Sequence, residues 1–279
     1  MTFSLPSNLR PIYIQSLTPQ QLIQSWISVG LSLVVGGMIG LMPQDSFALS
    51  PDTAPSELTK LLEKIETAAN RQDLEKVMDF YSPEFSHSDG FDRESLEEIL
   101  AQFWDEFSDV TYEMELQSWE KEGSTLIMTT VTTVTGRQRL KDREFQLEAT
   151  IVSEQRVEDK QIIQQDVLTE SSQLASGLEP PTVIFNVAET AQPEEKFSVD
   201  AIVEEPLDND ILLGAALDQS VDINRYFAAE TIQMELLNTG GLFKIADAPP
   251  IPEDRWISAI LMRKGGILSV TQRVRVIDN

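Results

Sequence analysis

The chain has 279 residues, with 46 acidic and 21 basic side chains and a formal net charge of −25. This acidic balance excludes a nucleic-acid partner held through its phosphates, which requires clustered cations, and it favours repulsion from anionic surfaces. The sequence has no cysteine, which excludes disulfides, thiol nucleophiles and cysteine metal sites, and its length of 279 residues predicts about two domains.

The N-terminal segment carries an apolar run over residues 26–42, followed by Ser46, Phe47 and Ala48. Such a run before small residues is typical of a secretory signal, here cleaved after Ala48. An uncleaved inner-membrane anchor over residues 26–42 is the alternative, although a span needs about 20 apolar residues. We expect residues 1–48 to direct export to the periplasm, the thylakoid lumen or the extracellular space, with membrane contact only in transit.

A leader over residues 49–55 precedes three predicted helices. The first begins near Ser56, the second is short and capped by Asp73, and the third is capped by Asp92. A short strand containing Phe85 separates the second helix from the third. The helical spacing places these apolar residues on inner faces: Leu58, Leu61, Leu62, Ile65, Ala68, Leu74, Val77, Met78, Tyr81, Leu96, Ile99, Leu100, Phe103, Trp104 and Phe107.

Four strand-like runs follow the third helix and end near Leu168. Apolar and polar residues alternate from Val110 to Gln117 and from Glu144 to Ile151, which is the period of a half-buried strand. The run from 125 to 135 is rich in Thr, Val and Ile on both faces, which favours a central position. Four consecutive strands joined by short turns predict an antiparallel meander.

This order of elements over residues 56–170 resembles the nuclear transport factor two-like, or SnoaL-like, cone fold. The resemblance implies an α+β domain in which helices pack across a curved antiparallel sheet and leave a pocket at the open end, near His87. The fold serves isomerases, cyclases, dehydratases, transport adaptors and assembly domains, so it indicates shape more directly than activity.

Residues 171–181 have the composition of a linker, with Ser-Ser, Ser-Gly and Pro-Pro pairs, and they predict a domain boundary. The rest, residues 182–279, reads as short strands separated by turn residues, including a hairpin around Lys264, Gly265 and Gly266. This pattern predicts a mostly β, sandwich-like domain that loosely resembles an immunoglobulin fold. Residues 226–237 also satisfy helical spacing, so a helix there is an alternative.

His87 is the only histidine, and Asp89 follows it on the same expected strand face. A carboxylate beside an imidazole is the usual arrangement for orienting a general base. Similarity to SnoaL-like enzymes implies that Tyr81 and Asp166 are the further candidates. The alternative is structural, with His87 hydrogen-bonded near a strand end and Asp89 in a turn.

Two other groups of side chains are candidates for binding. Aromatic and imidazole side chains indicate a ligand pocket, although aromatic residues at these spacings are commonly core. The pocket candidates are Tyr81, Phe85, His87, Phe103, Trp104 and Trp119. The basic residues Arg137, Arg139, Lys141 and Arg143 are spaced to share one strand face and could bind an anion or a partner; a charged hairpin end is the alternative.

The sequence predicts no metal site and no cofactor. One histidine without cysteine cannot form the usual zinc sites. Asp208, Asn209 and Asp210 are the nearest calcium candidate, but they lack the glycine and distal glutamate of a calcium loop and favour a polar turn. Phosphate loops, nucleophile elbows and dinucleotide motifs do not occur in the sequence.

These patterns favour an exported, non-enzymatic binding or assembly module whose cone domain carries a pocket for a small apolar ligand or an unidentified protein. A small-molecule isomerase, cyclase or dehydratase that uses His87 and Asp89 is the first alternative. A structural homodimer that pairs through its sheets is the second.

Overall fold

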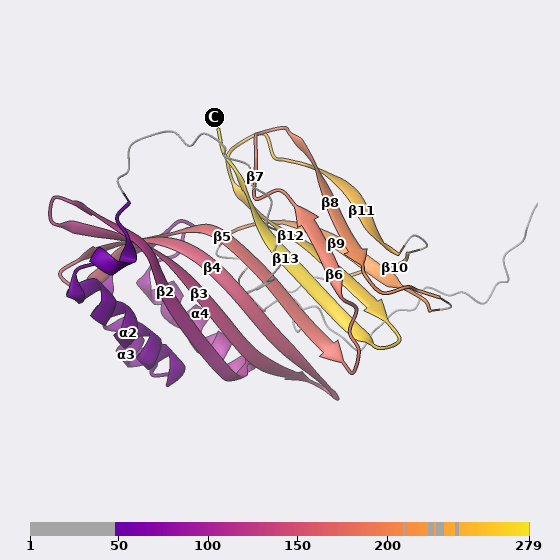
Figure 1. The fold of residues 1–279 in the computed structure, drawn as a ribbon, viewed down its shortest axis with the longest axis horizontal. Coiled ribbons are helices and arrows are strands. Elements are labelled where there is room, and N and C mark those ends of the chain that lie inside the picture. The colour runs from indigo at the N-terminus through magenta and orange to yellow at the C-terminus, as the bar shows by residue number, and fades with distance from the viewer. Residues whose placement is uncertain (1–47, 209, 223–225, 227–231, 238–239, 279) are drawn as a thin grey trace, which may run out of the picture.

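The computed structural model describes residues 48–208, 210–222, 226, 232–237 and 240–278 (Figure 1). The predicted signal or anchor over residues 26–42 lies outside these residues. Within the described part of the chain, no helix is long and apolar enough to cross a bilayer.

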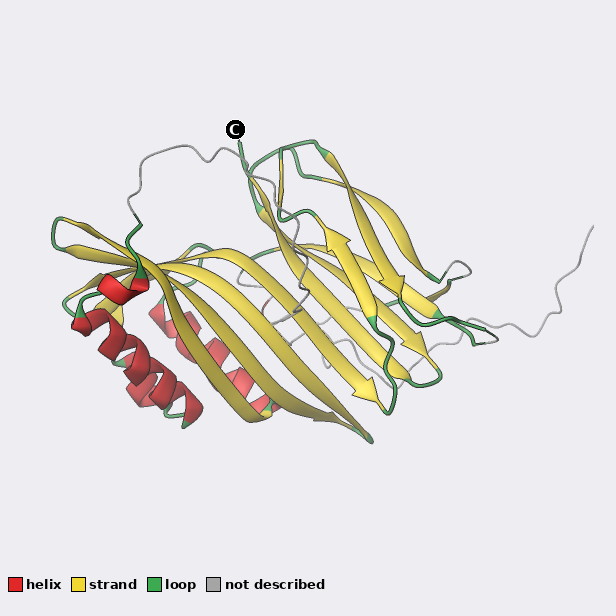
Figure 2. Cartoon of the chain, viewed as in Figure 1, coloured by secondary structure: helices red, strands yellow, loops and turns green. Residues whose placement is uncertain are grey.

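The helices gather at one end of the molecule (Figure 2) and belong to the first part of the described chain. A 3₁₀ helix, η1, covers Pro51–Thr53, and three α-helices follow: α2 (Ser56–Asn70), α3 (Leu74–Met78) and α4 (Arg93–Glu106). The predicted caps are confirmed for two of them, because the Asp73 carboxylate accepts the Lys76 N–H and the Asp92 carboxylate accepts the Ser95 N–H. The expected apolar face of α2 is buried.

The largest sheet of the described residues has ten strands. Its main path has the order β10-β9-β12-β13-β5-β4-β3-β2, and β1 also pairs with β5 and β7 with β13. The meander β2 to β5 is antiparallel, as predicted, and β1 lies parallel to β5. The strands of the first part are β1 (Tyr81–His87), β2 (Ser108–Glu122), β3 (Thr125–Leu140), β4 (Arg143–Glu158) and β5 (Gln161–Gly177). Those of the second part are β7 (Thr190–Ala191), β9 (Leu213–Ser220), β10 (Glu235–Leu236), β12 (Asp254–Arg263) and β13 (Gly266–Val276).

A second sheet has three strands in the order β11-β8-β6. Its strands are β6 (Val183–Val187), β8 (Lys196–Val203) and β11 (Gly241–Asp247). Apolar residues of β8 and β11, such as Ala201 and Leu242, share a buried cluster with Leu261 of β12 and Leu268 of β13. The small sheet therefore covers one face of the large sheet at its C-terminal end.

The helices cover one face of strands β2 to β5 (Figure 1). Side chains of α2 also reach the outer edge of β2: the Asn70 side chain bonds both the N–H and the carbonyl of Tyr112, and Glu66 accepts the Met114 N–H. This helix therefore satisfies backbone groups that an edge strand leaves unpaired. Helices and sheet together enclose the α+β cone expected from the sequence.

The predicted linker over 171–181 is wrong for residues 171–177, which belong to β5. These residues pair with β4 on one side and with β13 on the other, for example Leu174 with Leu147 and Ser269. Pairing on both edges satisfies the backbone of a serine-rich segment that looks loop-like by composition. The two parts of the chain are thus joined in one continuous sheet.

In the C-terminal part, the described residues of the segment that also satisfies helical spacing form a strand only at Glu235–Leu236. Of the alternative helix over 226–237, residues 227–231 lie outside the described residues, and residues 232–237 are not helical.

Candidate functional site

A cavity of about 190 Å³ lies between the helices and the large sheet. Its walls are mostly apolar and come from α2, α3, α4 and strands β1 to β5, with one described residue from the C-terminal part, Tyr226. The lining residues are Ile65, Ala69, Val77, Tyr81, Leu96, Ile99, Leu100, Gln102, Phe103, Trp104, Glu106, Tyr112, Met114, Thr132, Val134, Ile151, Ser153, Gln155, Gln165 and Tyr226.

Uncharged polar groups gather on the sheet side of this cavity. Gln165 donates to the Ser153 hydroxyl at 3.4 Å, and Gln155 accepts from Thr130 at 3.4 Å. Between α4 and the sheet, the Trp104 indole donates to the hydroxyl of Tyr112 on β2 at 2.8 Å. The cavity therefore offers amides and hydroxyls at some points of an otherwise hydrocarbon wall.

The ionisable groups of the cavity are held neutral or turned toward other partners. Burial raises the pKa of Tyr81 to about 12, and burial also raises the pKa of Tyr112. Glu106 is the only carboxylate among the described lining residues, and it accepts hydrogen bonds from Gln102 and Gln138. Its pKa is raised by burial.

His87, at the end of β1, is not among the residues that line the cavity. Its ring stacks on Phe91 with centroids 3.9 Å apart, and 4% of its side chain is exposed. Burial lowers the pKa of His87 to about 4. The Asp89 N–H donates to Nδ1 at 3.1 Å, so a neutral ring carries its proton on Nε2.

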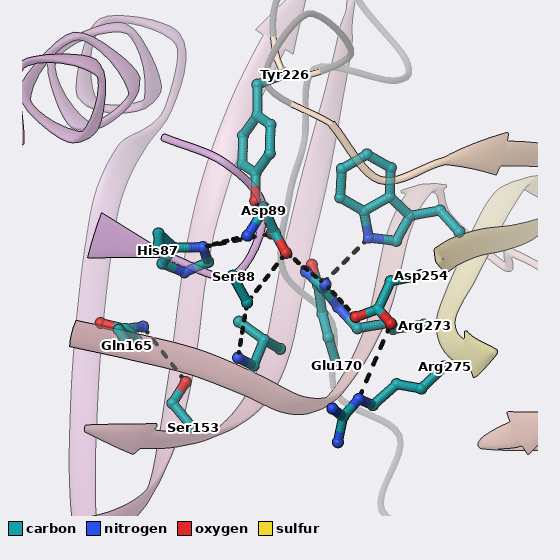
Figure 3. A network of polar contacts seen from close by, with 12 residues as sticks. His87, Ser88, Asp89, Ser153, Gln165, Glu170, Tyr226, Asp254, Arg273 and Arg275 are labelled. Atoms are coloured by element: carbon teal, nitrogen blue, oxygen red, sulfur yellow. Dashed lines mark hydrogen bonds and ion pairs between the residues drawn. The ribbon is translucent and has the colours of Figure 1, made fainter. Parts of the chain in front are cut away.

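Arg273 of β13 is the centre of a buried ionic network (Figure 3). Its guanidinium donates to both carboxylate oxygens of Asp89 at 2.8 Å, to Glu170 at 2.8–2.9 Å and to Asp254 at 2.9 Å. The Arg273 and Asp89 side chains are each 1% exposed. This bidentate, fully desolvated pair joins the loop after β1 to the C-terminal hairpin.

Two aromatic side chains complete the network. Tyr226 donates its hydroxyl proton to Asp89, and the Trp256 indole donates to Glu170 at 3.1 Å. Trp256 also lies under the guanidinium of Arg273, 5.7 Å from its ring centre, an attractive cation–π arrangement. Every charged member of the cluster thus has several partners.

The pKa values of Asp89 and Arg273 show that the network favours the charged forms of both groups. Burial alone would raise the pKa of Asp89, but the hydrogen bonds and charge of Arg273 outweigh it and lower the pKa to about 2. Burial opposes the charge of Arg273, yet Glu170 and Asp89 raise its pKa well above the usual value. Asp89 is therefore a committed ion-pair partner, and its carboxylate does not orient the His87 ring through Nδ1.

The structure separates the four catalytic candidates. Tyr81 lines the cavity, whereas His87 and Asp89 lie in the network beside it. Asp166 accepts from Gln164 at 3.3 Å on the face opposite to Gln165 and the cavity, since neighbouring strand residues alternate. His87, Asp89 and Asp166, which an enzyme of this type would bring together in one pocket, are not among the described residues that line the cavity.

The six pocket candidates also divide. Tyr81, Phe103 and Trp104 line the cavity. Phe85, His87 and Trp119 are not among its lining residues: Phe85 packs on Tyr81 as a core residue, and the Trp119 indole donates to Thr53 at 3.2 Å.

The four basic candidates lie at the exposed end of the β3–β4 hairpin. Lys141, with φ 54°, occupies the turn, and Arg143 begins the next strand, so the expected single strand face is wrong. Arg137 forms a surface ion pair with Asp109 at 3.8 Å. This placement fits the charged hairpin end.

The described residues contain no group of three or more acidic, histidine or cysteine side chains able to hold a metal ion. In the calcium candidate, Asn209 lies outside the described residues and Asp210 pairs with Arg263 at 3.3 Å.

Sequence reasoning missed Arg273, Glu170, Tyr226 and Trp256. Arg273 follows Ser269 and Thr271 on the polar face of its strand, a pattern that resembles solvent exposure. Its partner Asp89 is 184 residues away in the sequence. The signal that could have found it is an arginine paired across a hairpin with a tryptophan, here Trp256.

Comparison with protein families gives two matches. Residues 62–165 match the model of the SnoaL-like domain, and residues 178–277 match a domain of unknown function, DUF8623. Comparison with curated proteins gives no significant match.

Three solved structures illustrate the similarity to known folds. Bd1075 of Bdellovibrio bacteriovorus is 18% identical with a TM-score of 0.29, and the match covers 40% of this chain and 40% of that protein. A hypothetical protein from Catenulispora acidiphila with a ketosteroid isomerase-like fold is 12% identical over 41% of this chain and 85% of that one, with a TM-score of 0.30. An epoxide hydrolase of M. tuberculosis, described as LEH-like, is 13% identical over 40% and 81%, with a TM-score of 0.28. The family match, rather than these low scores, supports the fold assignment.

Proposed function

Because residues 62–165 form a SnoaL-like domain, we propose that this protein is an exported, non-enzymatic binding module whose cone cavity takes a small, neutral, largely apolar ligand. The observation that carries the proposal is the character of the cavity wall. It is mainly hydrocarbon, with the uncharged polar groups of Ser153, Gln155 and Gln165 on the sheet side.

The charge distribution around the cavity supports a neutral ligand. The described lining includes no lysine, arginine or histidine, and its single carboxylate, Glu106, already accepts two hydrogen bonds. An anionic ligand would lose hydration without gaining a cationic partner. A neutral molecule with one or two hydrogen-bonding groups matches this wall better.

The second candidate is an isomerase, cyclase or dehydratase that uses His87 and Asp89. A general base must lie within hydrogen-bond reach of the proton that it removes. Tyr81 lines the cavity but, with a pKa raised to about 12, holds its proton. His87 lies outside the lining and Asp89 is occupied by Arg273 and Tyr226, which favours the binding function.

The third candidate, a structural homodimer, would place the helix-free face of the sheet in an interface. That face carries exposed acidic side chains, among them Glu113, Glu115 and Glu148. Stable homodimer interfaces are more apolar than this. A monomeric binding domain is the better match.

Export and domain division remain proposals that rest on the sequence. The apolar run 26–42 and the small residues before Leu49 support cleavage after Ala48, which the intact mass of the protein from its host would test. The layering of the small sheet on β12 and β13 supports a sandwich-like module over residues 182–279. A division at residues 171–181 into separately folding units would have to cross the shared β5–β13 ladder.

Binding of N-phenyl-1-naphthylamine, a neutral probe that fluoresces in apolar sites, tests the proposal on the full chain. We expect saturable binding and a raised melting temperature, because a ligand that binds only the folded state stabilises it. Leu100→Trp, which fills the cavity, should abolish binding, whereas Phe243→Ala, an exposed site on β11, should not. Absence of saturable binding, or loss with Phe243→Ala alone, would reject the cavity as the binding site. Turnover of small enolisable carbonyl compounds that collapses in folded His87→Ala would favour the enzyme instead.

A further inference from the structure

Tyr226 is the one described residue of the C-terminal part that lines the cone cavity. The other described lining residues all lie between Ile65 and Gln165, within the SnoaL-like match. Tyr226 lies within the range matched by DUF8623. The cavity wall is therefore assembled from both family regions.

Tyr226 is held in place by three neighbours. Its hydroxyl donates to Oδ2 of Asp89. Its ring meets Phe91 edge to face at 5.4 Å and Trp256 edge to face at 5.5 Å, and 9% of the residue is exposed. Rings in these orientations attract one another beyond the burial of their area. The side chain is thus fixed before any ligand arrives.

Asp89, which holds the Tyr226 hydroxyl, is itself held by other buried side chains. Its carboxylate accepts hydrogen bonds from both terminal nitrogens of Arg273, and Arg273 also donates to Glu170 on β5. Glu170 accepts from Trp256, whose ring contacts Tyr226. A closed circuit of contacts therefore connects the cavity wall to the C-terminal hairpin β12–β13, and Figure 3 shows Tyr226, Asp89 and Arg273 in this succession.

We propose that the C-terminal part forms one wall of the ligand site, and that Tyr226 is a specificity-determining residue of that wall. This inference rests on the proposed function. The Tyr226 hydroxyl donates its single proton to the Asp89 carboxylate. Tyr226 therefore offers the ligand its aromatic ring and no hydrogen-bond donor. The part of the ligand beside Tyr226 is then apolar or aromatic, and its polar groups lie toward Gln155 and Gln165.

The geometry also links occupancy of the cavity to the C-terminal hairpin. A ligand that packs on the Tyr226 ring opposes local opening of Tyr226, and hence of its contacts with Trp256 and Asp89. Because linked states stabilise one another reciprocally, binding in the cone should slow opening of β12 and β13. An appended domain with no part in the site would show no such response.

Titration of the full chain with N-phenyl-1-naphthylamine tests the assignment. Tyr226→Phe keeps the ring and should bind the probe within about threefold of wild type. Tyr226→Ala should weaken binding at least about tenfold, the loss expected of an aromatic hot-spot residue. Tyr226→Leu also removes the aromatic ring and should weaken binding, and it replaces Tyr226→Ala if that variant does not fold, as judged by circular dichroism. Phe243→Ala is the control for loss of an exposed ring.

Hydrogen exchange of the wild type needs no substitution and gives a second measurement. Saturating probe should slow exchange in β12 and β13 around Trp256 and Arg273, as well as in the cavity strands. Unchanged probe affinity in Tyr226→Ala and Tyr226→Leu, or protection confined to residues 56–170, would overturn this inference alone. A wild type that binds no probe would overturn the proposed function and this inference together.

Discussion

Arg273 binds Asp89 through two parallel hydrogen bonds of 2.8 Å, although 184 residues separate them in the sequence. Asp89 follows β1 in the SnoaL-like region, and Arg273 lies on the final strand. Both side chains are 1% exposed. This pair is the buried ionic connection between the two family regions, and it lies directly behind a wall of the cavity.

Replacement of Arg273 by methionine should destabilise the protein by about 3–5 kcal/mol, because it leaves Asp89 and Glu170 buried without their cation. Urea unfolding of the full chain measures this change. Arg137→Met, which removes a surface ion pair, is the matched control and should cost well under about 1 kcal/mol. Equal costs for the two variants would mean that the buried network adds no stability.

The single histidine makes a clean pH prediction. Burial lowers the pKa of His87 from 6.5 to about 4, so between these values the unfolded chain binds a proton that the folded chain does not. This contribution to stability is complete above about pH 7 and is lost as the pH falls, by about 2 kcal/mol between pH 8 and pH 5. Asp89, with its pKa lowered from 3.8 to about 2, adds a separate loss only below about pH 4.

His87→Gln should remove the loss of stability between pH 8 and pH 5, whereas the loss below about pH 4, which comes from Asp89, should remain. The measurement is the free energy of unfolding of both proteins at several pH values from 8 to 5, and the difference between them isolates the imidazole. A pH dependence that is the same in both proteins would show that His87 titrates normally and is accessible to water.

Most helices and strands of residues 56–168 could be predicted from the sequence, because helix caps and hydrophobic periodicity depend only on residues close together in the chain. Asp73 and Asp92 cap their helices as predicted, and the alternation of β2 and β4 places the expected side chains inward. The site does not follow in this way. Ser171 to Gly177 have the composition of a linker, yet they pair with β13. Asp89 lies in a turn, as the structural alternative predicted, yet it also pairs with the distant Arg273. Both depend on partners about 90–180 residues away, which no local window contains.

Limited digestion with chymotrypsin should distinguish a strand from a linker in this region. Leu174 is buried in β5, whereas Leu178, one residue beyond the strand, is 99% exposed. We expect cleavage after Leu178 and none after Leu174 in the native protein, since proteolysis requires local unfolding of an ordered strand. Early cleavage after Leu174, read by mass spectrometry, would restore the linker interpretation.

Trp104 lines the cavity and should report on its occupancy. Trp104→Phe should lose most of the change in tryptophan fluorescence that a non-fluorescent neutral ligand produces, because the indole lies at the wall and bonds Tyr112. Trp119→Phe is the matched control, since Trp119 is outside the lining and bonds Thr53. A response that follows Trp119 instead would place the ligand elsewhere. As Trp104 is half-buried, Trp104→Ala should cost less than the about 3–5 kcal/mol expected of a fully packed tryptophan.

The most direct measurement of the central claim is methyl NMR of the isoleucine- and methionine-labelled full chain during titration with N-phenyl-1-naphthylamine. A ligand in the cone cavity predicts saturable shifts of the methyl groups of Ile65, Ile99 and Met114, which line it. Ile184 and Ile245, exposed on the three-stranded sheet, should not shift. Shifts of Ile184 and Ile245 with unchanged signals from the cavity residues would contradict the account.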